Sequence, residues 1–356
     1  TDVMAIVIRD AELKRDRQAM MDCLLRNRQR YEKNDTFEQR FDWAYSGNPY
    51  GEGRAWLAVD EAANKVIGFT SAFPRRMFVN GECMIGWNCA DFSIDKEYRT
   101  LGAAMKLRRA AKECVDRGEF AFLYAHPNDR MRVVHEKVGH HAIGKMVRYA
   151  ALLRLDHTLG AKLGNNPVSK VSAALANPLL RLMAPSRSGL DKFQFSLVQE
   201  QRFGEEYDRL FEKVKHQHSV IGSRDTEYLN WRFLRNPLYR AKSLRMQQDG
   251  ELKGYVLYYE GNGIARVADA IVEGKSDEMG ILLAGLIHHL RKDGISSISL
   301  RLHNMNPLLA QAQQLGFRYR DDATSTVIAY ASSTSPYAPV VLEGKNWFMT
   351  VGDRDI

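Results

Sequence analysis

The sequence has no long apolar run. Its longest apolar stretch, residues 280–287, is far shorter than the roughly 20 residues that a membrane-spanning helix requires. Residues 1–10 also lack the basic leader and the small-residue cleavage site of a signal peptide. We therefore expect a protein without a membrane span, located in the cytoplasm.

Cysteine is scarce and irregularly spaced. The four cysteines are Cys23, Cys83, Cys89 and Cys114. They form no CxxC pair, and a chain of 356 residues can bury a core without a disulfide framework. Neighbouring histidines at 140–141, 216–218 and 288–289 lack carboxylates or cysteines at the spacing of metal ligands. We expect reduced thiols and no metal site.

An excess of negative charge is also absent, because the net charge is +8. A positive chain attracts nucleic acid, an acidic membrane surface or a polyphosphate-bearing cofactor, and net charge alone does not choose among them. No nucleic-acid-reading motif and no basic stripe with interleaved aromatic residues is present, which disfavours nucleic acid. The composition, 45% hydrophobic and 26% charged, is that of an ordinary globular protein.

The length of the chain favours two compact units with separate cores. The first, residues 1–153, has a helical pattern, then a series of alternating strands, then a strand, a turn and a helix. The second, residues 193–332, repeats this order of elements. Its segment NWRFLRNPLY at 230–239 echoes FDWAYSGNPY at 41–50. We therefore expect a duplicated fold.

Two further segments complete the predicted organisation, a helical linker at 154–192 and a C-terminal tail at 333–356. Within the linker, apolar residues at 158–185 recur about every three to four positions, as in an amphipathic helix. Such a helix is either a packed connector between domains or an anchor on a membrane surface. Prolines interrupt any long surface-lying helix here, which favours the connector.

The most informative segment is the turn from Arg99 to Ala104. A helix is predicted to begin at about Leu101, and a helix start leaves backbone N–H groups without intrahelical partners and carries a partial positive charge. The glycine and the two alanines that follow are small enough to let a phosphate approach these amides. Arg99 adds positive charge and Thr100 adds a hydroxyl group. The turn therefore predicts a phosphate site.

The order of elements around this turn resembles that of the GCN5-related N-acetyltransferase family. The resemblance covers residues 56–149 and rests on the segments IDKEYRTLGAAM and HPNDRMRVVHEKVGHHAIG. In that family an Arg/Gln-x-x-Gly-x-Gly/Ala turn lies between the fourth strand and the third helix. The resemblance implies an α+β fold of two acyl-CoA N-acyltransferase-like domains, each a mixed, mostly antiparallel sheet flanked by helices.

The resemblance also implies a donor site. The residues that would bind the donor, acetyl-CoA or another acyl-CoA, are Phe92, Ser93, Ile94, Arg99, Thr100, Leu101, Gly102, Ala103, Ala104 and Asn128. The amides of 101–104 would hold the pyrophosphate, and the backbone of 92–94 would pair with the pantetheine arm like an added strand. Asn128 would contact the same arm. The thioester would meet its acceptor where this strand and the next one splay apart.

Acyl transfer to an amine requires one proton removed from the attacking ammonium and one delivered to the leaving thiolate. By the resemblance, His135 occupies the place of the tyrosine that the family commonly uses as the acid. An imidazole with an ordinary pKa of about 6.5 can serve as an acid if a neighbour keeps it protonated. The alternative is that His135 only packs beside the cofactor.

The identity of the base is less direct. Family members often use a glutamate in the fourth strand, but the comparable position here is Asn88, which cannot accept a proton. Strand alternation places Asp91 on the opposite face from Asn88, so Asp91 takes this role only where a β-bulge intervenes. A relay through water is an equal alternative.

The second unit lacks the phosphate turn. Its corresponding junction carries Asp277 and Glu278, whose charges would repel a phosphate at the helix start. We therefore expect a degenerate domain that supplies structure or acceptor contacts. Trp231 and Arg232, together with Asn88 of the first unit, are candidate acceptor-binding residues. The alternative for the first two is a core tryptophan beside a surface-paired arginine.

Together these patterns predict an acyl-CoA-dependent N-acyltransferase that moves an acetyl group from acetyl-CoA to a primary amine of a small molecule or amino sugar. A long-chain acyl group or an acyl carrier protein is an alternative donor, because the basic helix after the turn suits either. Two other functions stay open. One is a non-catalytic binding module, and the other is a tRNA-dependent aminoacyltransferase of related tandem fold, which generally lacks the pyrophosphate turn.

Overall fold

The computed structural model describes residues 6–28, 32–154, 189–274 and 276–355. The linker stretch at 158–185 lies outside these ranges. Within them, no helix combines the length and the apolar character needed to cross a membrane.

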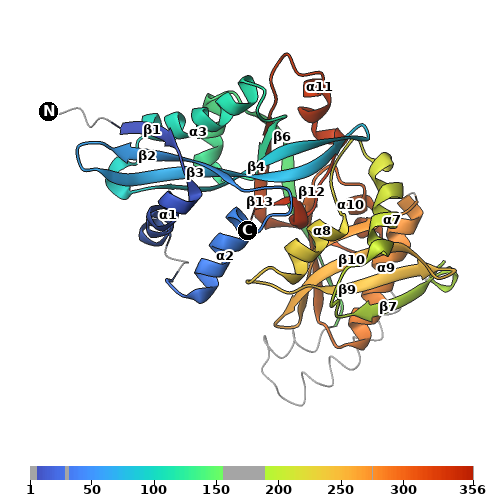
Figure 1. Ribbon diagram of the computed structural model, residues 1–356. Helices are drawn as coiled ribbons and strands as arrows, with labels where there is room; N and C mark the ends of the chain where they lie inside the picture. The colour runs from blue at the N-terminus through green and yellow to red at the C-terminus, as the bar shows by residue number, and fades with distance from the viewer. Residues whose placement is uncertain (1–5, 29–31, 155–188, 275, 356) are drawn as a thin grey trace.

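Helices and strands alternate through both halves of the chain (Figure 1). The first half contains β1 (Ile6–Asp10), α1 (Leu13–Asn27), α2 (Asp35–Tyr45), β2 (Arg54–Asp60), β3 (Lys65–Val79), β4 (Glu82–Ile94), α3 (Leu101–Asp116), β5 (Leu123–Ala125), α4 (Asp129–Lys137) and β6 (His141–Leu152). The second half contains β7 (Gln194–Val198), α7 (Glu205–Val214), β8 (Val220–Gly222), α8 (Thr226–Leu229), β9 (Lys242–Gln248), β10 (Glu251–Gly261), β11 (Ile264–Val272), α9 (Ser276–Lys292), β12 (Ser297–His303), α10 (Leu308–Gln314), β13 (Arg318–Tyr330), α11 (Ala338–Val341) and β14 (Trp347–Phe348).

The strands form one sheet in which the strands of the two halves follow the same order from opposite edges. The order is β1-β2-β3-β4-β5-β13-β6-β12-β11-β10-β9-β7, so each strand of the first half has a partner at the mirrored place in the second. Along this order most pairs are antiparallel, whereas β4–β5 and β11–β12 are parallel at equivalent places. Outside this order, β8 pairs in parallel with β14 and antiparallel with β3. The mixed, mostly antiparallel sheet flanked by helices confirms the predicted α+β class.

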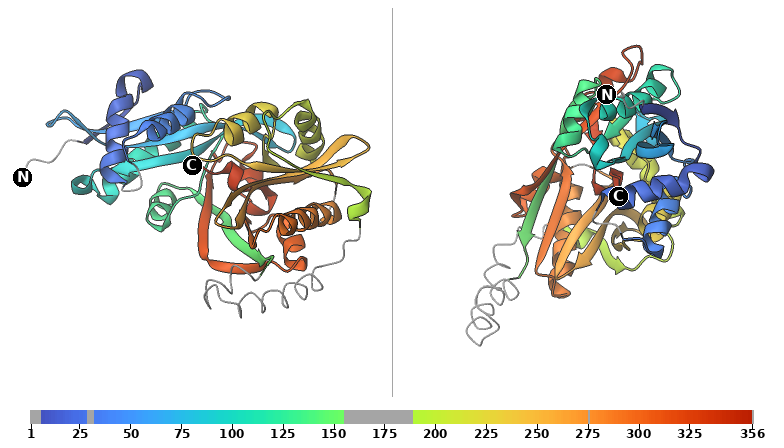
Figure 2. Two further views of the ribbon diagram at one scale, coloured as in Figure 1. Left: turned by 90° about the horizontal axis from the view of Figure 1, so that it is seen from below. Right: turned by 90° about the vertical axis from the view of Figure 1, so that its left-hand side faces the viewer.

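The two halves exchange their last strands. β6 pairs with β12 of the second half, and β13 pairs with β5 of the first half, while β6 and β13 also pair with each other at the centre. The sheet is therefore continuous across the predicted units 1–153 and 193–332. Residues 347–355 return to the middle of the molecule, where the two halves meet beside α2 (Figures 1 and 2).

The two faces of the first half are covered by different helices. Along β2, Ala55 and Leu57 pack with α1 and α2, whereas Trp56 and Ala58 pack with α3 and α4. Because successive strand residues point to opposite faces, α1 and α2 cover one face of the sheet and α3 and α4 cover the other. A ligand held between α3 and α4 must therefore pass through the sheet to reach the side of α1 and α2.

Local turn chemistry fixes the strand register. Asn80 and Gly81, with φ of 50° and 84°, join β3 to β4, and Asn262 and Gly263, with φ of 54° and 71°, join β10 to β11 at the equivalent place. Two residues with positive φ form the tight hairpin turn that matches the twist of the strands.

β4 departs from regular pairing on both sides near its end. On one side a single residue of β3, Thr70, faces two residues of β4, Asp91 and Phe92, which makes a β-bulge with Asp91 at φ 39°. On the other side β5 pairs with β4 only at Trp87 and Asn88. Beyond Asn88 the two strands separate, and the edge of β4 is open for further pairing.

Candidate active site

The predicted phosphate turn is the first turn of α3. Thr100 is the N-cap residue, and its Oγ1 accepts a hydrogen bond from the amide of Ala103 at 3.2 Å. In the described chain, the amides of Leu101 and Gly102 have no recorded partner, and the first turn carries no acidic side chain. These amides and the positive end of the helix suit a phosphate group.

Gly102 keeps this turn accessible. A Cβ placed there would meet no atom closer than Thr100 Oγ1 at 4.0 Å, so a side chain fits without disturbing the fold. Arg99 is fixed beside the turn, because its guanidinium donates to Ile94 O at 2.8 Å and to Asn27 Oδ1 at 2.8 Å. The positive charge of Arg99 thus stays next to the free amides.

A cavity of about 310 Å³ lies where β4 and β5 separate. Its walls come from the β4 bulge, from the loop after β5 and from α3 and α4, and we call it the donor cavity. The residues that line it are Arg28, Thr70, Cys89, Ala90, Asp91, Phe92, Arg108, Ala125, Pro127, Asn128, Met131, His135 and Asp355. It brings together Asp91, Phe92, Asn128 and His135 of the predicted site, whereas Ser93 and Ile94 are buried and do not line it.

Asn128 begins α4 at the mouth of this cavity. Its Oδ1 caps the helix by accepting from the amide of Met131 at 3.0 Å. Capping by asparagine fixes the direction of the helix and of its side chain. Asn128 also lines the donor cavity.

His135 lies in the wall of the donor cavity and is only 4% exposed. Burial, together with the nearby Arg108 and His140, lowers the pKa of His135 well below its ordinary value of 6.5. Its ring stands edge-on to that of His140 at 4.7 Å between centroids. The imidazole is therefore neutral near pH 7, and no described carboxylate is positioned to protonate it.

Asp91 occupies the predicted bulge, but its carboxylate is already engaged. It lies 2.6 Å from Arg40 and 3.1 Å from Arg28, and it accepts from Tyr45 Oη at 3.1 Å. Burial raises the pKa of Asp91, but the two arginines outweigh burial and leave the pKa below its ordinary value. Asp91 is thus held ionised in a buried ion pair, which makes it a weak proton acceptor.

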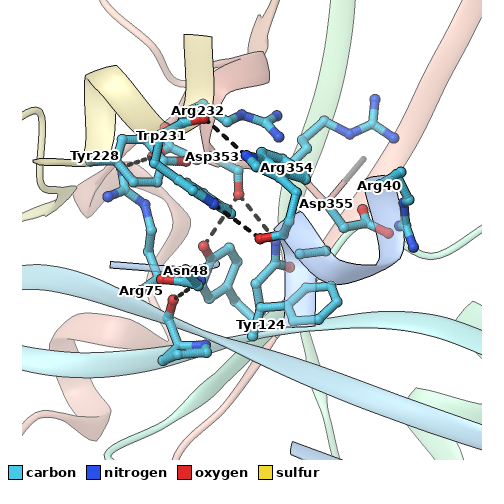
Figure 3. Close-up of a pocket in the computed structure, with 15 residues that line it drawn as sticks. Arg40, Asn48, Arg75, Tyr124, Tyr228, Trp231, Arg232, Asp353, Arg354 and Asp355 are labelled. Atoms are coloured by element: carbon cyan, nitrogen blue, oxygen red, sulfur yellow. Dashed lines mark hydrogen bonds and ion pairs between the residues drawn. The ribbon is translucent and has the colours of Figure 1, made fainter. Parts of the chain in front are cut away.

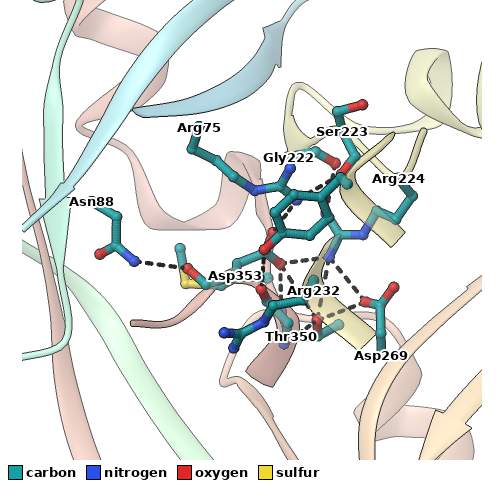
Figure 4. A network of polar contacts seen from close by, with 12 residues as sticks. Arg75, Asn88, Gly222, Ser223, Arg224, Arg232, Asp269, Thr350 and Asp353 are labelled. Carbon is teal, nitrogen blue, oxygen red and sulfur yellow. Dashed lines mark hydrogen bonds and ion pairs between the residues drawn. The ribbon is translucent and has the colours of Figure 1, made fainter. Parts of the chain in front are cut away.

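Residues near the C-terminal end of the described chain thread through the same region. The Asp353 carboxylate contacts Arg75 at 3.1 Å and also contacts Arg224, while it accepts from the amide of Thr350 at 3.0 Å (Figure 4). Arg224 also donates to Asp269 at 3.1 Å. Burial raises the pKa of Asp353, and Arg224 and Arg75 lower it further than burial raises it. This network fixes the segment from Thr350 onward.

Two of the predicted acceptor-binding residues hold this segment by its backbone. Asn88 donates to Asp353 O at 3.4 Å (Figure 4). Arg232 donates to Val351 O at 3.2 Å. Tyr124 donates to the same Asp353 oxygen at 3.2 Å. Asn88 is therefore a structural anchor for the segment from Thr350 onward.

A second, smaller cavity of about 30 Å³ lies on the far side of the sheet from α3, and we call it the acceptor cavity. The residues that line it are Arg40, Trp43, Ala44, Asn48, Phe73, Pro74, Arg75, Asn88, Tyr124, Tyr228, Trp231, Arg232, Asp353, Arg354 and Asp355 (Figure 3). All three predicted acceptor-binding residues are among them. Trp231 is 7% exposed and Arg232 is 4% exposed, so both are core residues as well as cavity walls.

Asp355 is the one described residue that lines both cavities. Burial and the neighbouring Asp91 raise its pKa, and Arg354 partly offsets this. Figure 3 shows its side chain turned toward Arg40 at the junction. Sequence reasoning assigned this residue to the tail, because nothing in the local pattern DRD indicates that the chain folds back into the site.

A larger groove of about 860 Å³ opens beside the acceptor cavity. It is lined by Arg148, Tyr239, Tyr259, Glu260, Gly261, Arg266, Val267, Ala268, Ser299, Arg301, Asp322 and Val351. Arg148 pairs with Asp322 at 2.9 Å, whereas Arg301 has no recorded ion pair in the described chain. Val351 links the two spaces, since its carbonyl accepts from Arg232 of the acceptor cavity. The groove is of the size typical of small-molecule sites.

Comparison with solved structures identifies the fold. No family model and no curated protein sequence matches the chain. A GCN5-related N-acetyltransferase from Anabaena variabilis matches with a TM-score of 0.63 and 11% identity, over 91% of this chain and 72% of that chain. A probable N-acyltransferase from Enterococcus faecalis matches with a TM-score of 0.64 and 10% identity, over 95% and 75%.

The similarity extends to an enzyme solved with a long-chain acyl-CoA. The N-myristoyltransferase of Saccharomyces cerevisiae, solved with bound myristoyl-CoA, matches with a TM-score of 0.55 and 12% identity, over 100% of this chain and 85% of that chain. At these identities the similarity concerns the fold. The predicted resemblance is confirmed at that level, and it extends over both halves of the chain.

Proposed function

We propose that the chain is an acyl-CoA-dependent N-acyltransferase that transfers an acetyl group from acetyl-CoA to a primary amine of a small molecule or amino sugar. One observation carries this proposal. α3 has free amides in its first turn and lines the donor cavity further along with Arg108, and this cavity meets the acceptor cavity at the carboxylate residue Asp355. A phosphate site, a slot for a thioester and a base thus follow one another in space.

The donor side follows from the open edge of β4. The pyrophosphate of acetyl-CoA binds the amides of Leu101 and Gly102, with Arg99 adding charge. The pantetheine arm extends along β4 past Phe92 and Asn128, where β5 has separated and leaves backbone groups for pairing. The thioester then lies at the bulge, between the two cavities.

Asp355 is the proposed base in place of Asp91. Its raised pKa makes it a stronger proton acceptor than a carboxylate tied to two arginines. The amine nitrogen attacks the thioester carbonyl carbon, the C–N bond forms, and the C–S bond breaks with its electron pair left on sulfur. Asp355 takes the proton that the nitrogen carries after the attack.

The groove beside the acceptor cavity is the proposed site for the rest of the acceptor. Its walls include Arg148, Arg266 and Arg301. They also include Tyr239 and Tyr259, whose ring centroids lie 5.4 Å apart with the rings tilted at 45°. Burial and the like charge of Arg148 lower the pKa of Arg301, a sign of positive charge that is not fully neutralised. An amine that also carries a carboxylate or phosphate suits this surface.

Binding of acetyl-CoA measured by calorimetry tests the proposal. Gly102→Glu adds a negative charge at the phosphate site without a steric clash, so it should weaken binding by about tenfold or more. Gly102→Ala is the matched control, since it fills the same open space without charge. Equal binding by the wild type and Gly102→Glu would place the donor elsewhere.

A further inference from the structure

The donor cavity contains a buried positive charge that no ion pair neutralises. Arg108, on α3, is 1% exposed and lines the cavity. Its guanidinium donates to Thr70 Oγ1, its Nε has no partner, and it forms no ion pair with any carboxylate of the described chain. A buried charge without an opposite charge is strongly unfavourable, so its persistence calls for a partner that arrives with a ligand.

The other fully buried arginines around the site are different. Arg40 contacts Asp91 at 2.6 Å, and Arg224 contacts both Asp269 and Asp353. Each of these cations has a carboxylate that stays in place whether or not a ligand is bound. Among these three, Arg108 alone lines a cavity without a recorded ion pair in the described chain.

The titratable groups that face Arg108 are neutral near pH 7. They come from β4 and from the region of α4, and they are Cys89, His135 and His140. Burial raises the pKa of Cys89, although Arg108 itself lowers it in part. Burial lowers the pKa of His140 to about 3 and that of His135 well below 6.5, and Arg108 adds to both effects. The cavity carboxylates Asp91 and Asp355 face Arg40, Arg28 and Arg354 instead.

The position of Arg108 along α3 indicates which part of a donor it meets. A helix rises about 1.5 Å per residue, which places Arg108 about 10 Å past the phosphate turn at Leu101. That distance separates Arg108 from the pyrophosphate and brings it toward the end of the pantetheine arm. Charge at this place acts on the thioester and its acyl group.

We propose that Arg108 binds negative charge at the reacting end of the donor, an inference that rests on the proposed function. Two sources share this chemistry. One is a carboxylate carried by the acyl group, as in a dicarboxylic acyl-CoA. The other is the thiolate of coenzyme A, which forms when the C–S bond breaks and its electron pair stays on sulfur. A thiolate stabilised by Arg108 leaves without a proton, so the neutral His135 need not supply one.

Four probes separate these sources in the wild-type protein. Succinyl-CoA and butyryl-CoA have acyl chains of equal length and differ in the terminal carboxylate. Coenzyme A and desulfo-coenzyme A differ in the thiol, whose ionisation is followed by ultraviolet absorbance as pH is raised. We expect either tighter binding of succinyl-CoA than of butyryl-CoA, or a lowered pKa of the bound thiol. The absence of both in the wild type would overturn the inference.

Arg108→Met and Arg108→Lys assign the effect to this side chain. Arg108→Met should reduce by about 30-fold whichever preference the wild type shows, that for succinyl-CoA over butyryl-CoA or that for coenzyme A over desulfo-coenzyme A. Binding of butyryl-CoA and desulfo-coenzyme A should stay nearly unchanged. Arg108→Lys should retain most of the preference because it keeps the charge. A preference that persists unchanged in Arg108→Met would contradict the inference. Failure of the wild type to bind any of the four compounds would instead overturn the proposed function, and the inference with it.

Discussion

Trp43 and Trp231 each donate an indole hydrogen bond to the backbone carbonyl of the other, at 2.9 Å and 3.1 Å, and their rings stack at 4.4 Å between centroids. They occupy equivalent places in the two segments whose sequences echo each other. Equivalent residues of the two similar halves therefore contact each other where the halves meet. The pair also closes the acceptor cavity, so the integrity of the interface and the shape of the site depend on the same two rings.

Replacement of Trp231 should destabilise the protein in two measurable steps. Trp231→Phe keeps a ring to stack but loses one hydrogen bond and leaves the Trp43 carbonyl without its partner, at a cost of about 1–3 kcal/mol in unfolding free energy. Trp231→Ala also removes the buried ring, at a cost of about 3–5 kcal/mol. Chemical denaturation measures both, with Tyr239→Ala, an exposed aromatic truncation, as the control. Equal stability of all variants would contradict a structural role for the pair.

Buried histidines should make the protein sensitive to mild acid. Burial lowers the pKa of His140 to about 3, whereas in the unfolded chain the pKa returns to about 6.5. The unfolded state then binds more protons below that value, so the unfolding free energy falls by about 1.4 kcal/mol per pH unit for such a group. The full contribution is present above pH 6.5 and decreases steadily as pH falls toward 3.

Denaturation curves at pH 7, 6 and 5 measure this slope. His140→Asn should be less stable at pH 7 and should lose less stability between pH 7 and pH 5 than the wild type does. Exposed His141 is the matched position, so His141→Asn should leave the slope unchanged. A wild-type stability that does not vary with pH over this range would show that His140 titrates normally.

Replacement of Asp353, which fixes the segment from Thr350 onward, should also destabilise the protein. Asp353 holds two buried arginines, so Asp353→Asn leaves both Arg75 and Arg224 with less compensation. Loss of one partner from such a buried network costs about 3–5 kcal/mol. Thermal unfolding should show this loss at pH 7. At pH 3 the difference from the wild type should shrink, because the unfolded chain takes up a proton on Asp353 below its ordinary pKa of about 3.9, whereas the folded-state pKa is lower.

Much of the fold was predictable from local signals, and two helix caps and one turn show why. Thr100 caps α3, Asn128 caps α4 and Asn80 with Gly81 turns between β3 and β4, because each of these preferences acts within a few residues. The bulge that was required for Asp91 is present as well. The assigned roles of the predicted site residues stay predictions.

The parts that escaped prediction depend on contacts between distant segments. The exchange of β6 and β13 follows from pairing between halves, which no local pattern reports. The same holds for Asp355, which reaches the cavities only because Asp353 is held by arginines from β3 and from the loop after β8. Burial by such contacts also explains why His135 is neutral, whereas its sequence neighbours suggest nothing of the kind.

The groove beside the acceptor cavity should select acceptors by charge. Arg301→Met removes a half-buried cation that has no recorded ion pair, so it should raise KM for an amine that carries a carboxylate or phosphate by about tenfold and leave KM for a neutral amine unchanged. Release of free thiol from acetyl-CoA follows the reaction. Arg318→Met, an exposed arginine outside the groove, is the control. A similar KM for charged and neutral amines in the wild type would exclude the groove as a charge-selective site.

Replacement of Asp355, the proposed base at the junction of the two cavities, should have a large effect on kcat. Asp355→Asn keeps the size of the side chain but cannot accept a proton, so kcat should fall by about 100-fold or more. Binding of acetyl-CoA should change little, because the phosphate turn is untouched. Since burial and Asp91 raise the pKa of Asp355, wild-type activity should increase with pH through that raised pKa as the carboxylate ionises, and this rise should vanish in Asp355→Asn.

Glu343→Gln, which removes an exposed carboxylate elsewhere in the same C-terminal region, is the matched control. Full turnover in Asp355→Asn with an unchanged pH profile would show that Asp355 is not the base. The base would then be Asp91 or water, and the kcat of Asp91→Asn would distinguish these two.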